Sequence, residues 1–411
     1  MLLLASGVGL YMAWNIGAND VANAMGTSVG SRSLTLKQAI IIAGVFEFAG
    51  AFLVGSHVTE TVRKGMLDLS LFEGRIEILM YGMLASLLAA GVWLQIATFY
   101  GWPVSTTHSI VGAVVGFGLA AVGTAGIAWG QIGQIVMSWV VSPLMSGTIA
   151  FVIFSIIRRV MINVPDPIRA TKRWAPVFIF FVFGILTLVT LFKGLKNLNL
   201  DLSFTTAAAI AIGISLVAGI VGWFLIGRLT VPEEETQDAF IAAMSTDLRA
   251  MVRRVHRIKE MATQEVEDQI NDIQDNLDTL LERAKQDEAH IQTRGDFRMV
   301  EKIFSYLQVL GACFIAFAHG ANDVANAIGP VAAVVSLATQ GAAALTAKTP
   351  VPIWILGLGG VGIVVGLATW GWRVIETVGK QITELTPSRG FAATFAAATT
   401  VVVASRMGLP I

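Results

Sequence analysis

The stretch GANDVANAMG, residues 17–26, decides the fold, because it returns as GANDVANAIG at residues 320–329. Each copy follows an apolar segment and carries one Asp and two Asn. If the apolar segments span a membrane, these polar side chains lie deep in hydrocarbon, where an ionisable group is costly and indicates a function by default. Two copies near the starts of the two halves predict a membrane protein built from duplicated repeats.

The composition places the chain among polytopic membrane proteins. Of its 411 residues, 55% are hydrophobic and 14% are charged, whereas soluble domains carry about 25% charged residues. Half of the charges lie in residues 228–302, which hold 11 Lys/Arg and 17 Asp/Glu. The single cysteine, Cys313, excludes a disulfide framework and a metal–thiolate cluster. We expect a first membrane half (1–227), a helical insertion (228–302) and a second membrane half (303–411).

Hydropathy predicts an all-α architecture with about 11 hydrophobic segments. The motif regions, residues 15–30 and 319–336, are expected to be broken or re-entrant helices, which a membrane tolerates only where protein or a water-filled cavity surrounds them. Because the first motif follows segment one and the second follows segment eight, an inverted-topology repeat is expected. The segments are 2–17, 36–54, 76–97, 110–122, 132–157, 174–191, 204–226, 303–318, 331–345, 353–370 and 391–404.

Basic residues predict the orientation in a plasma or inner membrane. Five of them crowd the connection between the fifth and sixth segments, on the face shared with residues 228–302: Arg158, Arg159, Arg169, Lys172 and Arg173. The positive-inside rule makes this face cytoplasmic and puts the N-terminus outside. Within the insertion, apolar residues between positions 266 and 284 recur at steps of four and three, which predicts a coiled-coil or helical-hairpin seam.

A second motif, GWPVSTTHS, occupies residues 101–109 and opens an apolar segment. Pro before a run of hydroxyl residues at a helix start leaves free backbone N–H groups and side-chain O–H donors, which suit an oxyanion. By itself this pattern is more typical of helix capping. Beside the paired Asn-Asp motifs, it favours anion binding.

These motifs resemble the signatures of the inorganic phosphate transporter (PiT) family, over nearly the whole chain. The resemblance implies a cation-coupled phosphate symporter with an inverted repeat and a homodimeric assembly. Carried onto this sequence, it implies a phosphate site formed by Asn19, Asp20, Ser105, Thr106, Thr107, Asn322 and Asp323. It implies sodium ligands at Asp20, Asn23, Asp323 and Asn326. Glu47 matches a membrane-embedded glutamate that the family uses for transport.

The sequence departs from the family pattern in its second repeat. The family carries a second Ser-Thr-Thr-His element there, whereas GLPI at residues 408–411 aligns with GWPV at 101–104 and the chain stops. The stretch ETV at 60–62 corresponds to ETV at 376–378, which supports this alignment. We therefore interpret the chain as a C-terminal truncation that lacks the last hydrophobic segment of the family.

The chemistry of the motifs indicates an anion that enters together with cations. Two aspartates facing a phosphate dianion gather several negative charges, and neither motif contains Lys or Arg. Like charges about 4 Å apart at an effective dielectric constant near 20 repel by about 4 kcal/mol. Co-transported cations, or protons on the carboxylates, must offset this repulsion. Amide and carboxylate oxygens are hard ligands, which favours Na⁺ over H⁺.

Other interpretations remain open from the sequence. Phosphate keeps a proton that can donate to Asp20 or Asp323, whereas sulfate is only an acceptor, so a sulfate permease is the first alternative. An anion channel is the second, although polarity concentrated at two points favours alternating access. No catalytic constellation, cofactor motif or nucleic-acid motif is present, so we expect no enzyme. Glu47 also fits a structural role, and His319, which stands where the first copy has Ile16, has no role assigned.

Overall fold

The computed structural model describes residues 1–56, 66–192, 202–229, 237–259, 264–346, 351–381 and 385–407. Over these ranges the secondary structure is helical, apart from one isolated β-bridge between Leu67 and Ile127. The longer helices are α1 (Leu2–Gly30), α2 (Leu36–Val54), α4 (Ile76–Phe99), α5 (Thr106–Val122), α6 (Trp129–Ile157), α7 (Pro167–Phe192), α8 (Phe204–Gly227), α9 (Gln237–Lys259), α10 (Gln264–Gln340), α12 (Ile353–Thr369), α13 (Gly371–Gln381) and α14 (Pro387–Arg406). Short helical turns are η1 (Leu69–Phe72), η2 (Thr124–Gly126), η3 (Arg158–Ile162) and α11 (Ala343–Thr346).

The protein is a multi-pass membrane protein. Among the described residues, six helices are long and apolar enough to cross a membrane, and the bent pair of α12 and α13 makes a seventh. The expected number of about 11 segments is not confirmed. One reason is that the segment predicted at 303–318 and most of the segment predicted at 331–345 belong to one continuous helix, α10, which ends at Gln340.

The structure corrects the position of the expected helix breaks. Both Asn-Asp motifs lie inside continuous helices, α1 and α10, whereas the bend of 64° falls between α12 and α13. The motif glycines serve close packing: a Cβ on Gly17 would overlap the carbonyl oxygen of Ile363, and one on Gly320 would overlap that of Glu47. Small residues let membrane helices approach closely, while an unbroken helix satisfies its own backbone groups.

Each motif helix packs against helices of both sequence halves. Helix α1 contacts α4 of its own half and α12 and α13 of the other, and α10 contacts α14 of its own half and α2 of the other. The two motif helices also contact each other. This exchange of partners brings residues from the two ends of the sequence into one apolar core.

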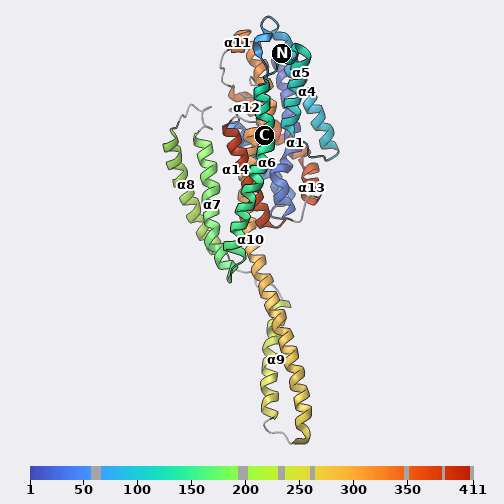
Figure 1. The fold of residues 1–411 in the computed structure, drawn as a ribbon, viewed down its shortest axis with the longest axis vertical. Helices are drawn as coiled ribbons and strands as arrows, with labels where there is room; N and C mark the ends of the chain where they lie inside the picture. Colours follow the sequence, from blue (N-terminus) through green and yellow to red (C-terminus); the bar gives the residue numbers. More distant parts are fainter. Residues whose placement is uncertain are drawn as a thin grey trace.

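Helix α9 and the first part of α10 form a helical hairpin that projects from the helix bundle (Figure 1). Helix α9 packs on the first part of α10, which then continues into the bundle without a break at the boundary expected after residue 302. Of the predicted seam residues, Ile270 is buried and Leu277 is half-buried, whereas Ile273 and Leu280 are 52% and 49% exposed. The predicted seam is therefore confirmed only in part, and Leu281, outside it, is also buried.

Polar contacts fix where two of the bundle helices begin. Thr35 and Gln38 form a capping box at the start of α2, in which each side chain satisfies the other's backbone N–H. At the start of α14, the backbone N–H and the hydroxyl of Ser388 donate to the Glu301 carboxylate on α10, at 2.8 and 2.7 Å. This second contact ties α14 to the helix that carries the second motif.

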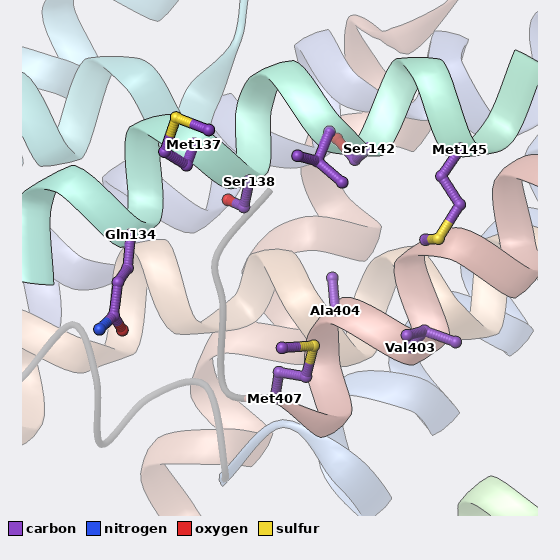
Figure 2. A pocket seen from close by; sticks show the side chains of 9 residues that line it. Gln134, Met137, Ser138, Ser142, Met145, Val403, Ala404 and Met407 are labelled. Atoms are coloured by element: carbon purple, nitrogen blue, oxygen red, sulfur yellow. The ribbon is translucent and has the colours of Figure 1, made fainter.

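A pocket of about 390 Å³ lies between α6 and α14 (Figure 2). Its lining consists of Gln134, Met137, Ser138, Val141, Ser142, Met145, Val403, Ala404 and Met407. None of these side chains is charged, so this pocket lacks the groups that would bind an anion or a cation tightly. The chemistry lies instead where α1 and α10 meet.

Candidate functional site

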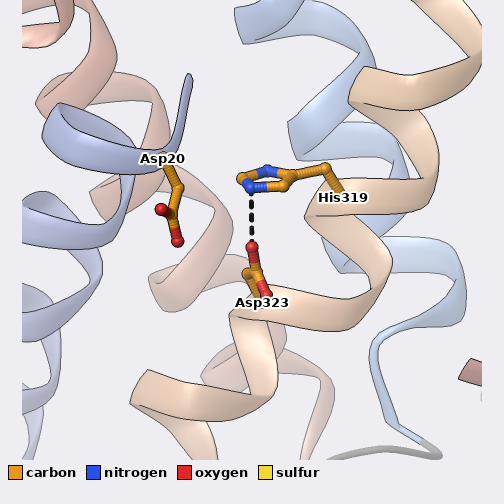
Figure 3. A group of neighbouring side chains, drawn as sticks. All are labelled: Asp20, His319 and Asp323. Carbon is orange, nitrogen blue, oxygen red and sulfur yellow. Dashed lines mark ion pairs between the residues drawn. The ribbon is translucent and has the colours of Figure 1, made fainter. Parts of the chain in front are cut away.

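The aspartates of the two motifs lie in one cluster, with a histidine beside them. Asp20 extends from α1 and Asp323 from α10, and His319 of α10 points toward both (Figure 3). One ligand atom of each residue lies within 4.8 Å of those of the other two. Nε2 of His319 forms an ion pair with Oδ2 of Asp323 at 2.6 Å. All three residues are buried, so the duplicated motif builds one site from two distant segments.

Two threonines at the start of α5 join this cluster. The Thr106 hydroxyl donates to Oδ2 of Asp20 at 2.5 Å, and the Asn326 amide donates to the Thr107 hydroxyl at 2.9 Å. Both threonines are buried. Ser105 is exposed and caps α5, because its hydroxyl oxygen accepts the backbone N–H of His108 at 3.1 Å. The structure thus brings Thr106 and Thr107 to the aspartates and gives Ser105 a capping contact.

Asn19 holds α1 against the connection between α4 and α5. Its amide nitrogen donates to the Thr98 hydroxyl at 2.9 Å and to the Trp102 carbonyl at 3.0 Å. Its amide oxygen accepts the backbone N–H of Val104 at 3.1 Å. Both ends of the amide are therefore occupied, which positions the Ser-Thr element; a role of Asn19 as a phosphate ligand stays a prediction.

The other motif asparagines differ between the two copies. Asn23 is exposed and donates to Oδ1 of Asp20 at 3.1 Å, whereas Asn326 and Asn322 are buried. The amide oxygen of Asn326 has no hydrogen-bond partner among the described residues. A buried oxygen without a donor needs an explanation, and a hard cation is one ligand that would satisfy it.

Glu47 of α2 is completely buried beside this cluster. Neither carboxylate oxygen has a hydrogen-bond partner in the described part of the chain, and Nδ1 of His319 lies 3.4 Å from Oε1. A buried charge without a partner is costly, so this contact matters for both residues. No role for His319 followed from the sequence; its only signal was that the first copy of the motif is preceded by Ile16 instead.

The charges of the cluster determine what it can bind. Asp20, Asp323 and Glu47 are acidic, His319 is the basic partner, and no Lys or Arg ion pair with these residues occurs in the described ranges. A phosphate dianion placed among these carboxylates would be repelled unless cations came with it. The hydroxyl and amide groups supply donors for an oxyanion, and the carboxylates supply oxygens for cations.

Comparisons with known proteins agree with this chemistry. A family model described as "Phosphate transporter family" matches residues 16–411. "Inorganic phosphate transporter 2-1, chloroplastic" of Arabidopsis thaliana is 44% identical over 98% of this chain and 62% of its own length, so the chain spans less than two thirds of that relative. A relative from Pyrococcus abyssi is 42% identical over the whole chain and 85% of its own length.

A solved structure shares the fold. "The sodium-dependent phosphate transporter" superposes with a TM-score of 0.79 and 37% sequence identity, covering all of this chain and 85% of that one. The likeness extends across both motif helices, because the whole chain is covered. The family match, the close relatives and the shared fold lead to one conclusion: the chain belongs to the phosphate transporter family.

Proposed function

We propose that this chain belongs to a secondary active transporter that imports inorganic phosphate together with a cation by alternating access, with Na⁺ favoured over H⁺. The observation that carries the proposal is the convergence of Asp20 and Asp323, from the two copies of the motif, in one buried cluster with Thr106 and Asn326. The named activity of the solved relative, a sodium-dependent phosphate transporter, supports the choice of cargo.

The proposed roles follow from the donor and acceptor chemistry of each residue. The hydroxyls and amides are the phosphate donors, and the aspartates accept the proton that phosphate carries. The carboxylate and amide oxygens are the Na⁺ ligands. The proposed phosphate set is Asn19, Asp20, Ser105, Thr106, Thr107, Asn322 and Asp323, and the proposed sodium set is Asp20, Asn23, Asp323 and Asn326.

Cation coupling follows from the electrostatics. Each unit of like charge at about 4 Å costs about 4 kcal/mol at an effective dielectric constant of 20, so the anion and the cations bind as one neutralised unit. The proposal also includes a homodimer, an N-terminus outside the cell and a cytoplasmic hairpin of α9 and α10. The basic residues of the connection between α6 and α7, such as Arg158 and Arg169, support that orientation.

Uptake into proteoliposomes tests the proposal. The purified chain is reconstituted, and radiolabelled phosphate uptake is measured with an inward Na⁺ gradient, an inward K⁺ gradient or a pH gradient alone. We expect saturable accumulation that requires Na⁺ and resists a large excess of sulfate. Accumulation driven by the pH gradient alone would replace Na⁺ with H⁺, sulfate competition would favour the sulfate alternative, and no accumulation under any gradient would overturn the proposal.

A further inference from the structure

Two pairs of helices in the protein cross with the same spacing of glycines and facing backbone carbonyls. Where α1 crosses α12, a Cβ on Gly17 would overlap the Ile363 carbonyl, and one on Gly366 would overlap the Trp14 carbonyl. Each helix therefore presents a glycine to the backbone of the other, which allows an approach that side chains would prevent.

The crossing of α10 with α2 repeats this arrangement residue by residue. A Cβ on Gly320 would overlap the Glu47 carbonyl, and one on Gly50 would overlap the Phe317 carbonyl. Position 320 thus corresponds to 17 and position 317 to 14, while position 47 corresponds to 363 and position 50 to 366. The correspondence identifies equivalent positions in the two halves from packing rather than from sequence alignment.

At these equivalent positions the two crossings differ in chemistry. The first crossing has Ile16 on α1 and Ile363 on α12, and both are buried. The second has His319 and Glu47, also buried. Both partners change together from apolar to ionisable. Since the isoleucines make the same crossing, close packing does not require the polar pair.

The polar pair gives the two aspartates unlike neighbours. His319 lies 3.4 Å from Glu47 and 2.6 Å from Asp323, whereas Asp20 accepts a hydrogen bond from Thr106. The asparagine three residues after each aspartate donates to it in both copies, Asn23 at 3.1 Å and Asn326 at 3.5 Å. A hydroxyl can turn its proton away and offer its oxygen to a cation, but a ring N–H cannot. The Asp20 side can therefore become a cation site in a way that Oδ2 of Asp323 cannot while the imidazole engages it.

We propose that Glu47 is a positioning residue that acts through His319. Glu47 holds the imidazole ring so that Nε2 engages Asp323, which makes the Asp323 half of the site different from the Asp20 half. This inference rests on the proposed function and deepens it, because it assigns the two halves of the site unequal contributions to cation binding. Outer partners that orient a metal ligand commonly change affinity 10–100-fold when they are removed.

The repeat itself supplies the test. Glu47→Ile with His319→Ile gives the second crossing the isoleucine pair of the first, and each single variant leaves one buried polar partner alone. We measure the thermal midpoint without Na⁺, the Na⁺ concentration that gives half of the Na⁺-dependent rise in that midpoint, and phosphate uptake. Ile16→Val with Ile363→Val, at the equivalent crossing, is the matched control and should keep wild-type uptake.

We expect each single variant to have a lower thermal midpoint than the wild type and the double variant to regain the wild-type midpoint. We do not expect the double variant to regain wild-type Na⁺ dependence or phosphate uptake. All three variants should need about 10–100-fold more Na⁺ and should take up phosphate poorly. Wild-type Na⁺ dependence in the double variant would make the pair structural and overturn the proposal. A further loss caused by Glu47→Ile in the His319→Ile background would also overturn it, since Glu47 would then act by another route.

A second set of variants tests the inference if the double variant does not fold. Glu47→Gln should raise the Na⁺ requirement in the wild-type background and leave it unchanged in the His319→Asn background; equal effects in both would overturn the inference. The Na⁺-dependent thermal shift needs no phosphate. A wild-type chain without phosphate uptake would therefore overturn the proposed function, while the pattern of thermal shifts would still decide the role of the pair.

Discussion

Each aspartate of the duplicated motif has polar neighbours of its own. Asp20 accepts a hydrogen bond from the Thr106 hydroxyl, whereas Asp323 pairs with the imidazole of His319. Each aspartate also accepts a hydrogen bond from the asparagine three residues later, Asn23 or Asn326. The two copies of the motif match at nine of ten positions. The surroundings of the aspartates nevertheless differ, because Thr106 comes from α5 and His319 stands where the first copy has Ile16. Both aspartates nevertheless belong to one cluster, so the loss of either should affect the whole site.

Asp20→Asn and Asp323→Asn should each abolish cation-driven phosphate uptake. Removing one charged partner from a buried cluster costs about 3 kcal/mol, or about a hundredfold in binding, while the amide keeps the size of the side chain. Uptake into proteoliposomes measures the effect, and the thermal midpoint of the purified variants shows whether they fold. Normal uptake by either folded variant would remove that aspartate from the site.

Variants of the hydroxyl residues in the Ser-Thr element can distinguish phosphate binding from helix capping. Thr107→Val should weaken phosphate binding by about 1–3 kcal/mol, because a buried donor is lost. Ser105→Ala should lower the stability of the protein by about 1 kcal/mol through the loss of a helix cap, with a smaller change in phosphate affinity. Calorimetric titration with phosphate at fixed Na⁺ gives both affinities, and an equal loss in the two variants would make Ser105 a full ligand.

The sequence predicted which side chains come together better than it predicted their contacts. The repeated motif and the Ser-Thr element pointed to Asp20, Asp323, Thr106 and Thr107, which the structure brings together. His319 received no role, because a single histidine beside a motif carries no periodic signal. Its importance depends on Glu47, which belongs to another helix and meets it only after folding.

At the scale of the elements, glycines of the motif helices determine how closely the helices pack. The sequence suggested breaks at both motifs, since glycine weakens a helix. That interpretation was wrong, because helix propensity depends on the residue alone and takes no account of the neighbouring helix that packs against a glycine. Gly17 and Gly320 lie against carbonyl groups of α12 and α2, where only a missing side chain allows contact. The bend between α12 and α13, by contrast, follows Thr369.

Gly366→Ala tests this role of the close crossings. Its new methyl group would meet the backbone of Trp14, which cannot move aside as a flexible side chain could. We expect a loss of about 1–3 kcal/mol in stability from overpacking. Gly213→Ala in α8 is the control, because nothing lies within 4 Å of its added Cβ and alanine favours a helix by about 1 kcal/mol. Thermal unfolding in detergent compares them, and equal midpoints would contradict the packing argument.

At the scale of the whole molecule, the bundle and the hairpin differ in composition and in packing. Residues 228–302, which include the hairpin, hold half of the charged residues of the chain. In the hairpin, α9 packs on the first part of α10. Charge segregation is the signal from which the sequence predicts a helical insertion, and its exposure to water stays a prediction. The sequence does not indicate that α10 continues through the boundary at residue 302, because the change from charged to apolar residues is the same whether the helix continues or ends.

Replacing residues 235–292 by a short flexible linker should preserve phosphate uptake if the hairpin is a solvated insertion. The bundle helices match the bilayer by their own hydrophobic lengths, and each doubling or halving of a connecting loop changes its closure cost by only about 0.6 kcal/mol. Folding is checked by size-exclusion chromatography and membrane insertion by co-flotation with the proteoliposomes. Uptake is measured in the same proteoliposomes, and Asp20→Asn provides the inactive reference. Because α10 runs unbroken from the hairpin to His319 and Asp323, the same helix could instead carry movement of the hairpin to the site. Complete loss of uptake in a normally inserted protein would establish that coupling and would reject the hairpin as a passive insertion.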